Sequence, residues 1–236
     1  MRIHLISSPR NLSTALMYSF AQRADMRVVD EPFYAYYLAR SGVDHPGREE
    51  VLASQPQDVE GVLHGLDAID DRQHLFLKGM AHHCEGIPAP RLAGMTSVFY
   101  IRDPKRIIAS FAEVIPNPGL RDIGLRMSVE LLESLQRVGG KCMVLDSDDL
   151  LADPRGVLAS LCDALGIGFD ERMLRWEAGP RPEDGVWASH WYANVHRSTG
   201  FAKQASSDRT LPDHLRSLCE EALPYYRRLQ QLRITA

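Results

Sequence analysis

Short runs of apolar residues alternate along the chain with longer stretches in which apolar residues recur every three or four positions. The short runs predict β-strands, and the longer stretches predict amphipathic helices. Strands are expected at 2–6, 27–30, 73–78, 96–102 and 141–145. Because strands and helices alternate, we expect a parallel sheet covered by helices on both faces. Ligands of such sheets bind at the C-terminal ends of the strands.

Two dipeptides mark the starts of helices. Asp103-Pro104 and Asp153-Pro154 each place an N-cap residue before a proline at the first helical position. A helix is also expected directly after the first strand. Further helices are expected at 33–41, 57–70, 120–138 and 213–232, with a loop at 42–48 and a kink or break at Pro224.

The length and composition are those of one globular domain, which we place at 1–236. The net charge of -4 gives no general attraction to nucleic acid or anionic membranes. The apolar runs are too short to cross a bilayer, and the first strand starts too early for a signal peptide. Four scattered cysteines without C-x-x-C spacing are typical of reduced thiols. We therefore expect a cytoplasmic protein, with its oligomeric state left open.

The connection after the first strand reads SSPRNLST at 7–14. The first turn of a helix exposes unpaired N–H groups and partial positive charge, which favours a bound anion. Arg10 adds a permanent charge, and Ser13 and Thr14 add hydroxyls. Alternatively, Ser13 is only an N-cap and Arg10 only a surface charge. The segment lacks the glycines and the lysine of a standard nucleoside triphosphatase loop.

Two motifs resemble sulfotransferases that use 3'-phosphoadenosine-5'-phosphosulfate (PAPS). The pattern SxPRxxST is similar to the phosphosulfate-binding loop of that family. The segment FYIRDPKRIIASF at 99–111 places Arg102 and Ser110 where the family holds the donor's 3'-phosphate. The segments DEPFY, KGMAHH and WYxxVHxSTGF look most like a bacterial and plant branch, whose members are called sulfotransferase-like or branched-chain aminotransferase-like.

The resemblance implies a P-loop NTPase-like three-layer fold, PAPS as sulfuryl donor and a small-molecule acceptor with a hydroxyl or amine. It implies donor contacts by Arg10, Asn11, Leu12, Ser13, Thr14, Arg102, Ser110, Ser198, Thr199 and Gly200. The best-known animal enzymes have Lys at the position of Arg10. By analogy with phosphoryl transfer, the protein mostly positions reactants and stabilises charge, and no metal is required. Alternatively, Arg102 pairs with Asp103 or Asp148.

Transfer to a hydroxyl also requires a base. Glu31 is the first candidate, because Pro32 keeps it out of helical geometry and lets it project into the strand-end crevice. Its alternative role is an acid at a helix start. His82 is the second candidate, since many sulfotransferases carry a base His after a strand-end Lys; otherwise it is a solvated or core ring. Lys78 is expected to assist the leaving group or steer the acceptor, or to be an exposed strand end. Arg10 is expected to stabilise charge on the leaving group.

Three other segments have expected roles. Residues 187–203 are predicted to form a loop folded over the ligand, with Trp191 or Tyr192 stacking on adenine or shaping the acceptor pocket, or else a packed loop. The acids of DSDDLLADP at 146–154 favour turn-forming and helix-capping roles over a metal site. The aromatic residues at 33–37 suggest an apolar acceptor pocket.

Two other functions stay open. One is an ATP-dependent small-molecule kinase on the same architecture, although the loop lysine that it needs is missing. The other is a nucleotide-binding module that has lost catalysis. An aminotransferase is disfavoured, because no lysine lies in a convincing cofactor-aldimine setting and the chain is short for that fold.

Overall fold

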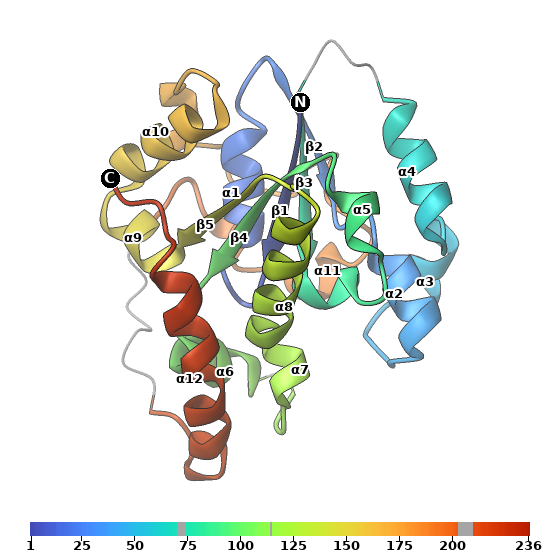
Figure 1. Ribbon diagram of the computed structural model, residues 1–236, viewed down its shortest axis with the longest axis vertical. Helices are drawn as coiled ribbons and strands as arrows, with labels where there is room; N and C mark the ends of the chain where they lie inside the picture. Colours follow the sequence, from blue (N-terminus) through green and yellow to red (C-terminus); the bar gives the residue numbers. More distant parts are fainter. Residues whose placement is uncertain (70–73, 114, 203–209) are drawn as a thin grey trace.

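The computed structural model describes residues 1–69, 74–113, 115–202 and 210–236. Within these ranges the strands are β1 (Arg2–Ser7), β2 (Met26–Asp30), β3 (His74–Met80), β4 (Thr96–Ile101) and β5 (Cys142–Asp146). They form one sheet in the order β2-β3-β1-β4-β5, and every pairing is parallel (Figure 1). In the central strand, Ile3 pairs with Phe76 of β3 and with Thr96 of β4. The predicted parallel α/β sheet is therefore confirmed.

Helices connect the strands and follow the last one (Figure 1). The longer helices are α1 (Ser13–Phe20), α2 (Tyr34–Ser41), α3 (Arg48–Ser54), α4 (Val59–Asp67), α6 (Pro104–Phe111), α8 (Leu125–Arg137), α10 (Pro154–Leu165) and α12 (Arg216–Gln230). The short ones are η1 (Ala81–Cys84), α5 (Ala89–Leu92), α7 (Leu120–Ile123), α9 (Ser147–Ala152), η2 (Glu171–Leu174), α11 (Ala188–Trp191), η3 (Val195–Arg197) and η5 (Asp213–Leu215).

Both faces of the sheet are buried. Successive side chains of a strand point to opposite faces. Val98 of β4 packs on one face with residues of α1 and α10, whereas its neighbour Phe99 packs on the other with residues of α6, α8 and α12. This two-sided burial explains why the strands read as nearly continuous apolar runs.

The structure differs from the predicted helices at three points. Helix α3 was not predicted, because its one buried residue, Val51, gives no apolar period. The predicted helix at 120–138 is divided at Gly124, whose φ of +76° is incompatible with an α-helix. Helix α12 continues through Pro224 without a break. Its buried side chains hold it on the sheet despite the lost hydrogen bond.

Residues 70, 73 and 203, at the predicted ends of a helix, a strand and a loop, lie outside the described ranges. Within those ranges, no helix combines the length and the apolar character that crossing a membrane requires. All four cysteines are free thiols.

The strand order brings four strand ends into a row. From β2 through β3 and β1 to β4 the row spans roughly 14 Å, because neighbouring strands lie about 4.8 Å apart. Residues that immediately follow these strands therefore share one edge of the sheet, even where they lie far apart in the sequence.

Candidate active site

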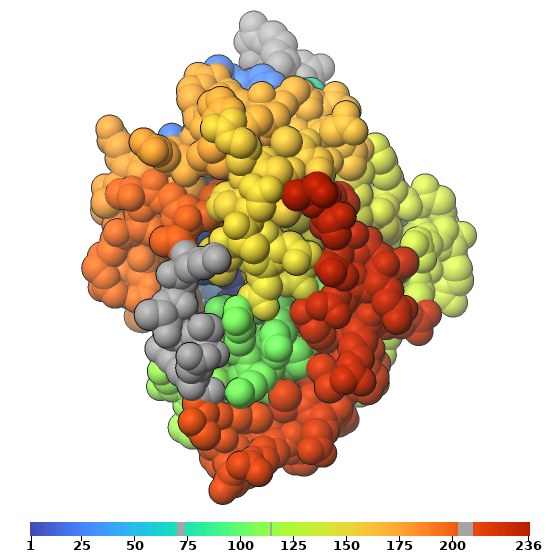
Figure 2. All heavy atoms as spheres, turned by 90° about the vertical axis from the view of Figure 1, so that its left-hand side faces the viewer, coloured from blue at the N-terminus to red at the C-terminus, as the bar shows by residue number. Residues whose placement is uncertain are grey.

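A cavity of about 290 Å³ lies along this edge. In Figure 2 a hollow opens between α6 (green) and the region of α9 (yellow), with N-terminal residues (blue) visible at its floor. The predicted site residues that line the cavity are Arg10, Asn11, Leu12, Ser13, Thr14, Glu31, Lys78, His82, Arg102, Ser110, Ser198 and Gly200. Thr199 does not line the cavity. Its carbonyl oxygen accepts a hydrogen bond from the backbone N–H of Trp176 at 3.1 Å.

The loop between β1 and α1 has an unusual backbone. Arg10 and Leu12 have φ values of +58° and +56°, in the left-handed region that non-glycine residues rarely adopt. Leu12 is the N-cap of α1, and Ser13 is the first helical residue. The alternative in which Ser13 serves only as the N-cap is therefore wrong. No side chain caps the helix, and the residues of its first turn line the cavity. The N–H groups of this turn are therefore available to a ligand in the cavity.

Hydrogen bonds join this loop to the corner after β4. The Asn11 amide donates to the Tyr100 carbonyl. Nη1 of Arg102 donates to the Arg10 carbonyl at 2.7 Å, and Nε of Arg10 donates to Oγ of Ser110 at 3.2 Å. Since β1 and β4 are adjacent, the fold brings together the two elements that the sequence suggested for phosphate binding.

The β1–β4 side of the cavity is positively charged. Lys105 and Arg106 of α6 line it together with Arg10 and Arg102. Arg106, rather than Arg102, forms the ion pair with Asp148. Arg102 is only 7% exposed, and its Nε has no hydrogen-bond partner among the described residues. A buried guanidinium with an unused donor is suited to an anionic ligand.

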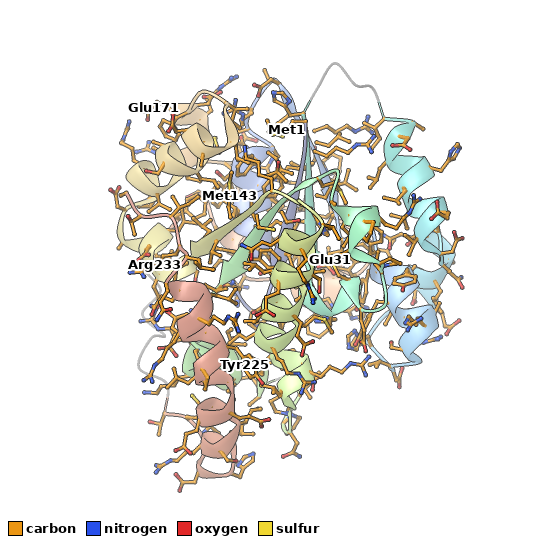
Figure 3. All side chains as sticks on the ribbon, viewed as in Figure 1. Met1, Glu31, Met143, Glu171, Tyr225 and Arg233 are labelled. Carbon is orange, nitrogen blue, oxygen red and sulfur yellow. The ribbon has the colours of Figure 1, made fainter. Side chains whose placement is uncertain are left out.

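The β2–β3 side holds a buried cluster of charges. Glu31, labelled in Figure 3, lies near the centre of the molecule. It follows β2 with a φ of +40°, outside the helix that begins at Tyr34, and its N–H donates to the Lys78 carbonyl at 2.6 Å. All the described non-glycine residues with positive φ, namely Arg10, Leu12 and Glu31, thus line the cavity. Strained backbone of this kind is typical of functional sites.

Lys78 is fully buried, so the prediction of an exposed strand end is wrong. Its ammonium has three partners. Nζ donates to Oε1 of Glu31 and to the Tyr192 hydroxyl at 2.7 Å, and it lies 3.1 Å from Oδ1 of Asp30. Burial opposes the charge on Lys78, but the two carboxylates outweigh it and raise its pKa. The hydrogen bond from Nζ holds Oε1 of Glu31, so Lys78 orients Glu31.

The two carboxylates share this one ammonium. Burial raises the pKa of Glu31 to about 7; Lys78 opposes the shift, and the charge of Asp30 adds to it. Glu31 can therefore exchange a proton near neutral pH, which is the property of an efficient general base.

Tyr192 completes the cluster from a distant part of the chain. Its hydroxyl donates to Oδ2 of Asp30 at 2.6 Å and accepts from Nε1 of Trp187 at 3.0 Å. The Gly185 N–H donates to the same Asp30 oxygen at 3.1 Å. These bonds attach the segment 185–192 to the end of β2. The sequence had suggested that Trp191 or Tyr192 stacks on adenine or shapes the acceptor pocket, and it had not indicated Asp30.

His82 and His83 are buried rings in η1 that line the cavity, so a solvated pair is excluded. Burial lowers the pKa of His82 to about 3 and that of His83 well below its usual value. Nδ1 of each ring lacks a hydrogen-bond partner among the described residues, and Nδ1 of His83 lies 3.7 Å from Oε2 of Glu31. His83 also stacks on Tyr34 at 4.6 Å. These imidazoles are neutral, and His82 is a weaker proton acceptor than Glu31.

Packing also favours glycine at position 200, because a Cβ there would lie 2.9 Å from the Leu174 carbonyl oxygen. Of the aromatic residues at 33–37, Tyr34 lines the cavity, whereas Phe33 and Tyr36 belong to the core. The expected aromatic acceptor lining is therefore corrected to Tyr34 together with Trp191 and Tyr192.

The acids of 146–154 have capping and pairing roles. Asp146 caps α9 and accepts from the Tyr226 hydroxyl, and Asp153 caps α10. Asp149 pairs with Arg233. The described residues contain no group of three or more His, Cys, Asp or Glu that could hold a metal ion.

The model of the family described as "Sulfotransferase domain" matches residues 1–233. Two curated relatives from Arabidopsis thaliana are branched-chain-amino-acid aminotransferase-like proteins 1 and 2, at 41% and 39% identity over 95% of this chain. The chain spans 40% of the length of each. The predicted resemblance, including the aminotransferase-like label of the branch, is confirmed.

Solved structures show the same fold. The sulfotransferase domain of the Synechococcus PCC 7002 olefin synthase has a TM-score of 0.56 at 20% identity and covers 94% of both chains. A sulfotransferase from Alicyclobacillus acidocaldarius has a TM-score of 0.61 at 13% identity, and the match covers 98% of this chain and 96% of that protein. Mouse sulfotransferase SULT7A1 complexed with PAP has a TM-score of 0.60 at 12% identity. The match covers 98% of this chain and 88% of the mouse protein. The predicted P-loop NTPase-like three-layer fold is thus confirmed.

Proposed function

The chain belongs to the sulfotransferase domain family, and we propose that it transfers a sulfuryl group from PAPS to a hydroxyl of a small molecule. The observation that carries this proposal is the junction of the two cationic corners, in which Arg102 bonds to the Arg10 carbonyl and Arg10 bonds to Ser110. PAPS carries anionic groups at both ends of one nucleotide. Two adjacent cationic corners in one cavity suit such a molecule.

The residues present fit this donor. Arg102, Ser110 and Lys105 would hold the 3'-phosphate, because Arg102 has an unused buried N–H and all three line one part of the cavity. Arg10 and the first turn of α1 would hold the phosphosulfate. When bound, PAPS supplies the sulfuryl group and a phosphate leaving group. Arg10 and the helix N–H groups stabilise the charge that develops on such a leaving group.

Glu31 is the base in this proposal. Lys78 holds Oε1, so Oε2 is left to accept the hydroxyl proton of the acceptor. A pKa of about 7 leaves a large fraction of Glu31 ionised near neutral pH and still basic enough to take that proton. The role proposed for Lys78 thus changes from assisting the leaving group or steering the acceptor to positioning the base.

Calorimetry with 3',5'-adenosine bisphosphate (PAP), ADP and AMP tests the donor. We expect PAP to bind more tightly than the other two. Arg102→Ala should lose more than tenfold in PAP affinity, because a hydrogen bond to a charged group contributes about 1.5–3 kcal/mol. Arg126→Ala, an exposed arginine paired with Glu130, is the control and should keep wild-type affinity. ADP binding that equals or exceeds PAP binding would overturn the proposal and favour the kinase alternative.

Catalysis is tested by the release of PAP from PAPS in the presence of a panel of small phenols and alcohols. We expect turnover that Glu31→Gln reduces at least a hundredfold, the usual contribution of a general base being about 100- to 10,000-fold. Tight PAP binding without turnover on any member of the panel would instead indicate the non-catalytic nucleotide-binding module.

A further inference from the structure

The charges of the cavity are unevenly distributed along the sheet edge. The cationic side chains Arg10, Arg102, Lys105 and Arg106 lie at the ends of β1 and β4. The acidic cluster of Asp30, Glu31 and Lys78 lies at the ends of β2 and β3. This second side is where an acceptor must place its hydroxyl, because the candidate base is there.

The acidic cluster has one carboxylate more than it has cations. Nζ of Lys78 donates to Glu31 and to the Tyr192 hydroxyl and lies 3.1 Å from Oδ1 of Asp30, so two carboxylates already share its charge. When Glu31 is ionised, the cluster carries a net charge of −1. Asp30, Glu31 and Lys78 are each at most 5% exposed, so water screens this charge poorly.

No other described cation compensates this charge from the walls on this side. The imidazoles of His82 and His83 are buried and neutral. Arg121 lies 6.0 Å from the ring of Tyr37, but it is paired with Glu85 and does not line the cavity.

The uncharged walls on this side suit a cation. The Tyr34 ring, stacked on His83, and the Trp191 side chain both line the cavity. The face of an aromatic ring attracts an ammonium group electrostatically. Two unpartnered imidazole nitrogens, Nδ1 of His82 and Nδ1 of His83, can accept hydrogen bonds from its N–H groups.

We propose that this side of the cavity selects the acceptor by charge: it takes hydroxyl compounds that also carry a protonated amine, and it rejects those that carry a carboxylate or phosphate in place of the amine. The inference rests on the proposed function, because it assumes that the acceptor lies beside Glu31. It names amino alcohols and aminophenols as the acceptor class.

Three phenols of similar size and different charge test the proposal. Tyramine carries a cationic chain, 4-propylphenol a neutral one and 4-hydroxyphenylacetate an anionic one. Each is titrated calorimetrically at pH 8 into protein saturated with PAP. We expect tyramine to bind roughly tenfold or more tightly than 4-propylphenol, as one charge pair in a partly buried site provides, and the anion to bind most weakly.

Variants assign the selectivity to the cluster. Glu31→Gln and Asp30→Asn should each bring the tyramine and 4-propylphenol affinities within about threefold of each other, since each removes the excess negative charge. Glu113→Gln, which removes a cavity-lining acid outside this cluster, is the matched control and should keep the wild-type ratio. Two independent variants keep the test valid if one of them fails to fold.

Equal affinities, or tighter binding of the neutral or anionic phenol by the wild-type protein, overturn the proposal. Selectivity that survives both cluster variants overturns it as well. PAP affinity is measured first: normal PAP binding without charge selectivity refutes only the inference on the acceptor, whereas absent PAP binding refutes the proposed function.

Discussion

Replacing Glu31 with Gln provides a test of the charge cluster that needs no substrate. The pKa of Glu31 is about 7 in the folded protein, against a usual value of 4.5. The folded protein therefore holds this proton more tightly than the unfolded chain. Stability from this group is fully present below pH 4.5 and is lost as the pH rises toward and through 7. Gln does not ionise, so the variant lacks this loss.

The size of the effect follows from the two pKa values. A rise from 4.5 to about 7 corresponds to roughly 3 kcal/mol of lost stability at high pH. Most of this loss, about 2 kcal/mol or more, falls between pH 5 and pH 8. The difference in unfolding free energy, Glu31→Gln minus wild type, should therefore grow by about 2 kcal/mol or more over that range.

Urea denaturation at pH 5, 6, 7 and 8 measures this difference. Glu130→Gln, at an exposed glutamate, is the control, and its difference from wild type should stay within about 0.5 kcal/mol. Asp30→Asn should reduce the pH dependence, since it leaves Lys78 to Glu31 alone. A Glu31→Gln difference that is constant or shrinks as the pH rises would refute the reasoning, because Lys78 would then neutralise Glu31 fully.

Three further predictions concern other parts of the molecule. Tyr192→Phe removes the hydroxyl that joins segment 185–192 to the cluster of Asp30, Glu31 and Lys78. We expect urea denaturation to show a free energy of unfolding about 1–3 kcal/mol lower than that of the wild type, and an unchanged value would contradict the described hydrogen bonds. Gly200→Ala places a Cβ 2.9 Å from the Leu174 carbonyl oxygen and should lower stability by about 1–3 kcal/mol; a neutral result in the same melts would show that this contact is loose. Burial raises the pKa of the Cys84 thiol to about 12, so at pH 8 the half-buried Cys219 should react with a disulfide reagent before Cys84 does. Mass spectrometry measures the order, and the reverse order would contradict the packing.

The cationic corners of the cavity could be predicted because their signals are local. Arg102 ends a strand, and Asp103-Pro104 starts the next helix within two residues, so the position of the corner follows from neighbouring residues. The loop after β1 shows that neighbouring residues alone do not always predict the backbone. Residue preferences favour Ser13 as the N-cap, yet Leu12 takes that position, because bonds from Arg102 and Asn11 across the sheet fix the loop.

The charge cluster could not be predicted in the same way. Tyr192 contacts Asp30 across 162 residues, and only the folded chain brings them together. One signal was available: Asp30 and Glu31 are adjacent acids at a strand end, and Lys78 lies near the end of the parallel neighbouring strand, in register with Asp30. Two acids beside one lysine at a buried edge indicate a shared ion pair, but the pairing of β2 with β3 has to be known first.

The cavity draws its groups from four strand ends in a row, and this has a consequence for how related enzymes can diverge. Most of these groups lie in the last residues of a strand or just after it, and exchanging a side chain removes no main-chain hydrogen bond of the ladder. Under the proposed function, residues near the ends of β2 and β3 can therefore change toward new acceptors while those after β1 and β4 keep the same nucleotide. Specificity and donor use can evolve as separate modules of a single sheet.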